Sequence, residues 1–414
     1  MPIWAGVSLS SGSQPEVSVL ILGQRRIDGT TIGTPGGRPL PLTGRPLTDT
    51  PVVVKKPGVQ LRAYPEVCLP SEEPLAEDEM RVICTGSGNP MVRRGQAATG
   101  WLVQLGNGDN FVFDVGGGTV QNLFSLEIHP AYLDKLFLTH LHLDHVGDFH
   151  VLFDALGWAR NTPLHVWGGS GATPELGTAA FCDHMQKAAM WHTESKKGLV
   201  PSGGMKIVAH EFDSGLFTSE NPRILVYDAN DVRIYAFPVA HILVGAVGYR
   251  LEWNGLSMTF HGDGEPSVFE AEQAAGVDLF MHECFPDAET FAQWTKMPLG
   301  TAKKVVGAHT TPDRLGQLFD IAKPNLGVAY HYSQSDDRID PFFDSIQTTY
   351  DGPVAIAQDL TVINVTPEQI VVREAQTDLL HDTPPGPDEG PPEFDPKNPG
   401  VTPSIVTDTI LPIE

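Results

Sequence analysis

Four side chains that can bind a metal ion lie within a six-residue stretch of the segment FLTHLHLDHVGDF, residues 137–149. They are His140, His142, Asp144 and His145. Imidazole and carboxylate groups suit zinc and other divalent metals of similar chemistry. The apolar run before His140 predicts a buried strand that ends in a turn. In such a turn the two earlier histidines can face one way and the two later ligands another, which favours two adjacent half-sites over one closed site.

Two other interpretations of this segment are a group of surface histidines and a structural zinc site. Random clustering of four such residues is rare, and structural zinc sites usually contain cysteine. The four cysteines, Cys68, Cys84, Cys182 and Cys284, form no C-x-x-C pair. The sequence therefore predicts neither a disulfide framework nor a cysteine zinc site, and isolated cysteines are most often small buried residues.

The pattern H-x-H-x-D-H after an apolar strand resembles the metallo-β-lactamase superfamily. Downstream, the segments FPVAHILVGAVGYR, TFHGDGEPS and GVAYHYS carry His241, Asp263 and His331 in the order in which that family carries its remaining ligands. The GYR segment after His241 is similar to the tRNase Z-like branch. The match covers residues 81–365.

This resemblance implies two metal ions held by seven ligands, with zinc expected and manganese or iron also compatible. It further implies that the two ions share one carboxylate and one hydroxide, and that the ions lower the pKa of the bound water. The implied ligands are His140, His142 and His241 for one ion, Asp144, His145 and His331 for the other, and Asp263 as the bridge.

The resemblance also implies catalytic roles for three residues. Asp144 could orient the hydroxide in addition to binding a metal. His309, in GAHTTPDRLGQLF, is expected to donate a proton to the leaving group or to stabilise developing negative charge. Glu283, in FMHECF, is expected to hold the ring of a histidine, either His309 or a metal ligand. The adjacent His282 receives no role.

Four further positions are considered around the expected site. Arg93 and Arg94 could bind an anionic group of the substrate, because arginine matches sulfate and phosphate oxygens, although a solvated surface pair is the other interpretation. The family often has Thr after the bridging aspartate, whereas Gly264 stands here, so we expect weaker orientation of Asp263. His261 is interpreted as a packing residue.

The predicted substrate class depends on an inserted basic arm that this chain lacks. The tRNA-processing members of the branch usually insert a long basic arm between the GYR segment and the bridging aspartate, but here a single hairpin with an Asn254-Gly255 turn connects Arg250 to Asp263. The formal net charge is −24, which repels polyanions. These observations predict a small anionic ester as substrate and no nucleic acid partner.

Segments such as LDKLFLTHLHLDHVGDF and VDLFMHECF resemble the arylsulfatase-like members of the branch. We therefore expect a sulfate ester hydrolase with possible phosphodiesterase activity. The alternatives are a lactonase or β-lactamase, a tRNase Z-like phosphodiesterase, an iron-binding redox member and a non-catalytic scaffold. The complete ligand set argues against the last two.

The elements around these motifs predict an α/β fold, a four-layer αβ/βα sandwich with N- and C-terminal extensions. We expect a Gly/Pro-rich extension over residues 1–80, a catalytic domain over 81–365 and a Pro-rich arm over 366–414. The two extensions suggest a homo-oligomer, a dimer or higher. The sequence contains no run of about 18 apolar residues, so no membrane span is predicted. The first residues lack a signal peptide pattern, which favours the cytoplasm, or the periplasm or secretion if a signal was removed.

Overall fold

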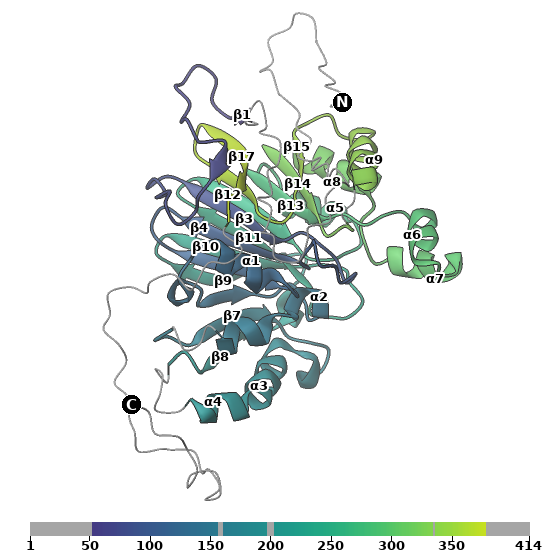
Figure 1. Cartoon of the computed structure of the whole chain (residues 1–414). Helices are drawn as coiled ribbons and strands as arrows, with labels where there is room; N and C mark the ends of the chain where they lie inside the picture. The colour runs from purple at the N-terminus through teal and green to yellow at the C-terminus, as the bar shows by residue number, and fades with distance from the viewer. Residues whose placement is uncertain (1–51, 156–159, 197–202, 334–335, 378–414) are drawn as a thin grey trace, which may run out of the picture.

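Two β-sheets stack face to face, with helices on both outer sides, in the computed structural model (Figure 1). The structure describes residues 52–155, 160–196, 203–333 and 336–377. This is the four-layer α/β sandwich of the metallo-β-lactamase fold that the sequence predicts. Most of the two expected extensions, residues 1–51 and 378–414, lies outside the described residues, and their role in an oligomer stays a prediction.

The larger sheet has the strand order β1-β17-β16-β3-β4-β5-β6-β7-β8, and β2 pairs with β17. The four strands at one end of this sheet, β5, β6, β7 and the edge strand β8, run parallel to one another. The strands are β1 (Val52–Val54), β2 (Val67–Cys68), β3 (Met80–Gly86), β4 (Gly100–Leu105), β5 (Asn110–Val115), β6 (Lys135–Phe137), β7 (Leu164–Gly169), β8 (Ile207–Phe212), β16 (Thr361–Val365) and β17 (Gln369–Ala375).

The smaller sheet has the order β15-β14-β13-β12-β11-β10-β9. Strands β12 to β15 are parallel, and β9 to β12 form an antiparallel meander. The predicted hairpin between β11 and β12 is present, with Asn254 and Gly255 at positive φ in its two-residue turn. The strands are β9 (Ile224–Ala229), β10 (Val232–Pro238), β11 (Val247–Trp253), β12 (Leu256–His261), β13 (Leu279–Glu283), β14 (Leu326–Tyr330) and β15 (Val354–Ile356).

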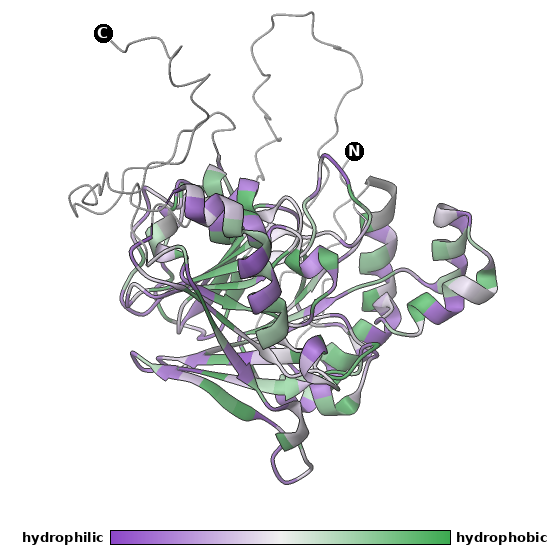
Figure 2. Ribbon diagram, turned by 90° about the horizontal axis from the view of Figure 1, so that it is seen from below, coloured by the Kyte–Doolittle hydropathy of each residue, from purple (hydrophilic) through white to green (hydrophobic). Residues whose placement is uncertain are grey.

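Aromatic and aliphatic side chains from both sheets form the main core between them. The ring of Phe113 on β5 lies 5.6 Å from that of Phe260 on β12, and Phe137 on β6 lies 5.4 Å from Tyr249 on β11. Full burial of each such side chain contributes roughly 1.5–3 kcal/mol. The strands are accordingly mostly hydrophobic in Figure 2, whereas the outer helices carry both hydrophobic and hydrophilic residues.

Helices cover the outer face of each sheet. Those on the larger sheet contribute Val120, Leu123 and Cys182 to a second core, and those on the smaller sheet pack around Leu315 and Phe319. The α-helices are α1 (Thr119–Ser125), α2 (Leu143–Val146), α3 (Thr178–Ala188), α4 (Met190–Ser195), α5 (Val268–Gln273), α6 (Ala288–Thr295), α7 (Leu299–Val306), α8 (Pro312–Ala322) and α9 (Asp336–Gln347). Shorter helical pieces are Pro130–Tyr132, Val151–Ala155, Pro174–Leu176 and Ser214–Leu216.

Helices α6 and α7 pack against each other and project from the sandwich as a pair (Figure 1). A small apolar cluster that includes Phe285, Phe291 and Ala302 holds the pair together. None of the helices in the described part of the chain has the length and hydropathy of a membrane span.

The larger sheet continues past residue 365, where we expected the catalytic domain to end. Strand β17 lies between β16 and β1 and is almost entirely buried. The Pro-rich stretch over residues 383–403 suggested the arm, and it lies outside the described residues. Strands β1 and β2, within the segment expected as an extension, pair with β17 in the same sheet.

Parallel strands end at the same edge of their sheet, and this edge positions the candidate ligands. The segment with the histidine cluster follows β6 in the larger sheet. Asp263 follows β12, Glu283 ends β13 and His331 follows β14 in the smaller sheet. Crevices beyond the carboxyl ends of such strands are the usual ligand sites of α/β sheets.

Candidate metal centre

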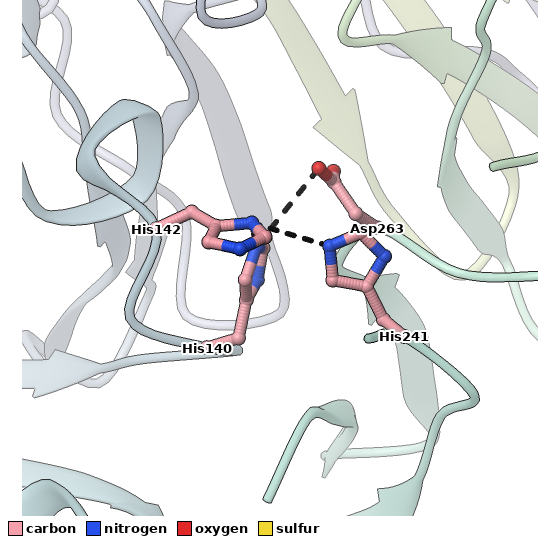
Figure 3. Close-up of side chains that lie close together, drawn as sticks. All are labelled: His140, His142, His241 and Asp263. Carbon is pink, nitrogen blue, oxygen red and sulfur yellow. Dashed lines mark hydrogen bonds and ion pairs between the residues drawn. The ribbon is translucent and has the colours of Figure 1, made fainter. Parts of the chain in front are cut away.

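The first candidate half-site brings together three histidines and one carboxylate, His140, His142, His241 and Asp263 (Figure 3). His142 Nδ1 lies 3.0 Å from His140 Nε2 and 3.2 Å from His241 Nε2. His140 Nε2 lies 3.9 Å from Asp263 Oδ2. Ligand atoms of a tetrahedral zinc ion lie about 3.3 Å apart, given bonds of roughly 2.0 Å. His142 is exposed, so this half-site faces solvent.

The second candidate half-site contains Asp144, His145, His331 and again Asp263, all of them buried. Asp263 Oδ1 lies 3.2 Å from His145 Nε2 and 3.3 Å from His331 Nε2. His331 Nε2 lies 3.1 Å from Asp144 Oδ2. Asp263 thus presents Oδ2 to the first half-site and Oδ1 to the second, which is the geometry of a bridging carboxylate.

The candidate ligand atoms of the second half-site are better placed to bind a cation than to form hydrogen bonds with one another. His145 Nε2 and Asp263 Oδ1 are buried and make no hydrogen bond among the described residues. Although burial opposes it, the carboxylates of Asp263, Asp114 and Asp144 raise the pKa of His145 well above its ordinary value. Buried polar atoms normally have partners, so this half-site attracts a cation.

Burial lowers the pKa of each histidine in the first half-site, His140, His142 and His241. Each ring is therefore held neutral, and a neutral imidazole is the form that binds a metal. His241 Nδ1 donates to the carbonyl oxygen of Ala308 at 2.9 Å, which leaves the lone pair of Nε2 directed at the half-site.

Asp114, on β5, supports the second half-site from behind. Its Oδ2 accepts a hydrogen bond from His145 Nδ1 at 2.7 Å, and both of its oxygens accept from Thr139. This contact fixes the tautomer of His145, so that Nε2 is the ligand atom. The sequence patterns predicted no role for Asp114. The missed signal is its place at the end of β5, beside the parallel strand β6 that leads to the histidine cluster.

Glu283 was expected to hold the ring of either His309 or a metal ligand. It lies close to both His309 and the candidate ligand His331. Its Oε1 accepts from His309 Nδ1 at 3.1 Å and from the backbone nitrogen of Thr310 at 2.9 Å. Its Oε2 lies 3.8 Å from Nδ1 of His331. Although burial opposes protonation, the carboxylate of Glu283 raises the pKa of His309 to about 9 in the protein alone.

The ring of His309 borders the candidate centre. It stacks on Phe285 with 4.2 Å between ring centroids, and its centroid lies 5.3 Å from that of His241. His309 Nδ1 also lies 3.9 Å from Asp263 Oδ2. A histidine that is held protonated at this position can act as a general acid.

Gly264 does not leave Asp263 without support. Its backbone nitrogen donates to Glu283 Oε1 at 3.3 Å, and its carbonyl oxygen accepts from the hydroxyl of Thr310 at 2.9 Å. A Cβ at this position would lie 2.3 Å from a methyl carbon of Val239. The backbone is therefore fixed from two sides in a space that suits glycine.

The backbone is unusual at His331, whose φ is 65°. Non-glycine residues rarely adopt this left-handed conformation, and where they do the strain often serves a functional site. The backbone nitrogen of His331 donates to the carbonyl oxygen of Ser87 at 2.7 Å, which links the residue to the loop after β3.

The loop after β3 also carries the predicted anion-binding pair. Arg93 is half-buried and Arg94 is exposed. The loop borders the site, because the backbone nitrogen of Thr99 donates to the carbonyl oxygen of Asp144 at 3.0 Å. A role of the two arginines in substrate binding stays a prediction.

Comparison with known proteins gives consistent matches. The family model described as "Metallo-beta-lactamase superfamily" matches residues 93–180. Ribonuclease Z of Mycolicibacterium gilvum (strain PYR-GCK) is 25% identical over 302 residues, which cover 70% of this chain and 96% of that protein. Ribonuclease Z of Mycolicibacterium paratuberculosis (strain ATCC BAA-968 / K-10) is 30% identical over 211 residues, 49% of this chain and 69% of that protein.

The crystal structure of human tRNase Z, short form (ELAC1), has a similar fold, with a TM-score of 0.51 at 18% sequence identity. The match covers 68% of this chain and 98% of that one. By sequence and fold, the chain belongs to the metallo-β-lactamase superfamily, and its relation to ribonucleases Z supports a metal-dependent hydrolase. Within that superfamily it belongs to the tRNase Z-like branch.

Two expectations from the sequence are wrong in light of these matches. The relatives are named ribonucleases Z, which contradicts a sulfate ester hydrolase and supports the tRNase Z-like alternative; a close resemblance to arylsulfatases is not shown. The exclusion of nucleic acid, with a small anionic ester as the substrate, is contradicted by the same relatives. It rested on the missing basic arm and on the net charge of the whole chain, and the net charge does not describe the potential at one site.

Proposed function

We propose that this protein is a binuclear metal-dependent phosphodiesterase that cleaves RNA, with precursor tRNA as its substrate class. The observation that carries the proposal is the relation to ribonuclease Z over 70% of the chain and 96% of one relative. The convergence of seven ligand side chains on two half-sites around one shared carboxylate supports it, because paired metals are a common solution for phosphodiester hydrolysis.

Zinc is the metal we propose for both half-sites, since histidine and carboxylate ligands suit it. When bound, such a pair supplies a hydroxide nucleophile at neutral pH and neutralises phosphate oxygens. In the proposal, Asp263 bridges the pair. Asp144 binds the ion of the second half-site and orients the nucleophile through its carboxylate.

The proton for the leaving oxygen comes, in this proposal, from His309. Glu283 keeps this ring charged and oriented through the hydrogen bond of 3.1 Å. Phe285 holds one face of the ring and excludes water from it. Arg93 and Arg94 are proposed to bind a substrate phosphate beside the centre.

The test is cleavage of a precursor tRNA that carries a 3′ extension, by zinc-loaded full-length protein, followed on a gel. We expect cleavage that stops when a chelator removes the metal and returns when zinc is added. The Asp263→Asn variant should lose activity by several orders of magnitude. Asp183→Asn, an exposed carboxylate on α3, is the matched control and should retain it. Wild-type protein that holds two zinc ions and cleaves no RNA would overturn the proposal.

A further inference from the structure

A second group of metal-binding side chains lies outside the centre described above. It consists of His261 at the end of β12, Glu270 on α5 and His282 on β13. All three side chains are at most 1% exposed. One potential ligand atom of each lies within 4.8 Å of the other two. None of the three belongs to the seven proposed ligands.

The distances in this group are close to those between ligands in the main centre. Glu270 Oε2 lies 3.5 Å from His282 Nε2 and 4.0 Å from His261 Nδ1. In the main centre, the corresponding pairs span 3.0 Å to 3.9 Å. Two histidines and one carboxylate are a common protein ligand set for zinc and for iron.

The tautomer of His282 suits metal binding. Its Nδ1 donates to the backbone carbonyl oxygen of Glu283 at 2.8 Å, so the lone pair of Nε2 faces Glu270. His241 of the main centre shows the same arrangement, with a backbone carbonyl behind Nδ1 and the lone pair of Nε2 facing the ligands. A partner of this kind behind the ring is typical of metal-binding histidines.

His261 is left without a partner. Neither of its ring nitrogens makes a hydrogen bond within the part of the chain that the structure describes, although the residue is fully buried. The rings of Phe237 and Phe280 lie 4.7 Å and 4.8 Å from it, so its surroundings are apolar. A buried polar group without a partner costs about 1–3 kcal/mol, and a cation beside Nδ1 removes that cost.

Glu270 also needs a positive charge. Among the described residues its carboxylate forms no ion pair with lysine or arginine, and only His261 and His282 lie within 4.0 Å as charge partners. A buried carboxylate is normally paired or bound to a metal. One proton shared with His282 is the competing way to satisfy it, but that proton leaves His261 without a partner.

We infer that His261, Glu270 and His282 bind a third metal ion, a divalent transition metal such as zinc or iron. The site joins β12, β13 and α5. His261 lies two residues before Asp263, and His282 directly precedes Glu283. The ion therefore fixes the two strand ends that carry the bridging carboxylate and the partner of His309. Because the site is closed, the ion is bound during folding and exchanges slowly. The inference does not depend on RNA cleavage.

The experiment is metal content by mass spectrometry on full-length protein, expressed with zinc or with iron and then dialysed against a small excess of the same metal. We expect three ions per chain for wild type and two for Glu270→Gln. The matched control is Glu272→Gln, an exposed carboxylate on the same helix, which should keep three. A second variant, His261→Phe, suits the aromatic surroundings and should also hold two.

Two results overturn the inference. One is wild-type protein that holds only two ions when saturated with zinc and only two when saturated with iron. The proton shared between Glu270 and His282 would then be enough to satisfy the buried carboxylate. The other is Glu270→Gln or His261→Phe protein that folds and still holds three. If a variant fails to fold, cobalt-loaded wild-type protein decides. Difference absorption between wild-type protein refolded with three and with two equivalents of cobalt should show a distinct visible band, and its absence counts against the site.

Discussion

Two carboxylates that are not proposed ligands lie behind the second half-site of the candidate centre. Asp114 accepts a hydrogen bond from His145, and Glu283 lies between His309 and His331. Both carboxylates are fully buried. Groups in such positions fix the orientation of a ligand ring and raise its basicity, so they influence metal affinity without touching the metal.

Substitution Asp114→Asn tests this role. The amide keeps the size of the side chain but removes the negative charge that holds the ring of His145. We expect the affinity of the second half-site for zinc to fall about 10- to 100-fold, while the first half-site is unchanged. Competition with a chromophoric chelator measures both affinities. Two unaltered affinities in a folded variant would show that Asp114 only packs.

Substitution His309→Ala tests the proposed proton donor. Loss of a general acid typically lowers kcat by about 10²- to 10⁴-fold. We expect a decrease of this size on precursor tRNA at pH 7, with both zinc ions of the main centre retained. Since His309 is proposed to act as an acid, wild-type activity should also fall as the pH rises through its pKa, and the variant should lack that limb. An unchanged pH profile in the variant contradicts the role.

The side chains of the candidate centre could be identified from sequence because each follows an apolar strand and the family motifs occur in order. Asp114 could not, because it lies 26 residues before His140 and its contact with His145 depends on the parallel pairing of β5 with β6. His261 was interpreted as a packing residue. Its lack of hydrogen bonds becomes visible only when the neighbouring strands are placed.

At the scale of elements, the strands of the two sheets were the most predictable part. The hydrophobic patterns predict strands over residues 100–105, 232–238 and 247–253, and Thr311-Pro312 predicts the start of a helix over 312–322; strands β4, β10 and β11 and helix α8 have these bounds. Strand β17 was assigned to an irregular arm. It is buried on both faces, so it lacks the alternation that identifies a half-exposed strand, and it carries the fully buried Arg373.

Arg373 is paired in a way that gives a pH-dependent prediction. Its two terminal nitrogens donate to Glu73 at 2.9 Å and 3.3 Å, and Glu73 also accepts from the backbone nitrogen of Leu69. Although partial burial opposes it, these bonds lower the pKa of Glu73 from 4.5. The ionised form is therefore favoured in the folded state. Its stabilisation is present above pH 4.5 and is lost as the pH falls through the lower folded value.

We expect Glu73→Gln to lower the free energy of unfolding at pH 7 by about 1–2 kcal/mol, a value reduced for the solvent that reaches Glu73. The difference from wild type should shrink below pH 4.5. Urea unfolding at a series of pH values measures it. Asp183→Asn, which removes an exposed ion pair with Lys187, is the control and should show no such difference. A difference that is constant down to pH 3 contradicts the assignment.

At the scale of the whole molecule, the net charge explains why nucleic acid was wrongly excluded. The sum of −24 includes residues 378–414, which contain eight of the 51 acidic residues and one of the 27 basic residues. Two exposed lysines lie on a segment that connects two residues of the proposed site. The α6–α7 pair lies between Glu283 and His309 in the sequence, and exposed Lys303 and Lys304 are on α7. The projecting pair is thus a candidate contact for RNA in a chain whose β11–β12 hairpin leaves no room for an arm.

An acidic protein that cleaves RNA should respond to salt in an unusual way. Most RNA-binding proteins lose affinity as salt rises, because binding releases counterions. Here long-range repulsion opposes the encounter, and the Debye length falls from about 20 Å at 0.02 M salt to about 8 Å at 0.15 M. We therefore expect kcat/KM for precursor tRNA to rise several-fold over this range. A small phosphodiester with one charge should respond less.

Lys303 and Lys304 should attract RNA locally and so reduce the rise of kcat/KM with salt. Replacing Lys303 and Lys304 by glutamate should lower kcat/KM for RNA and make the rise with salt steeper, with no effect on the small phosphodiester. Lys187→Glu on α3, an equally exposed lysine, serves as the control for charge alone. If kcat/KM of the wild type falls steeply with salt instead, RNA is bound through more basic contacts than the described surface offers, and whole-chain repulsion has no part in substrate selection.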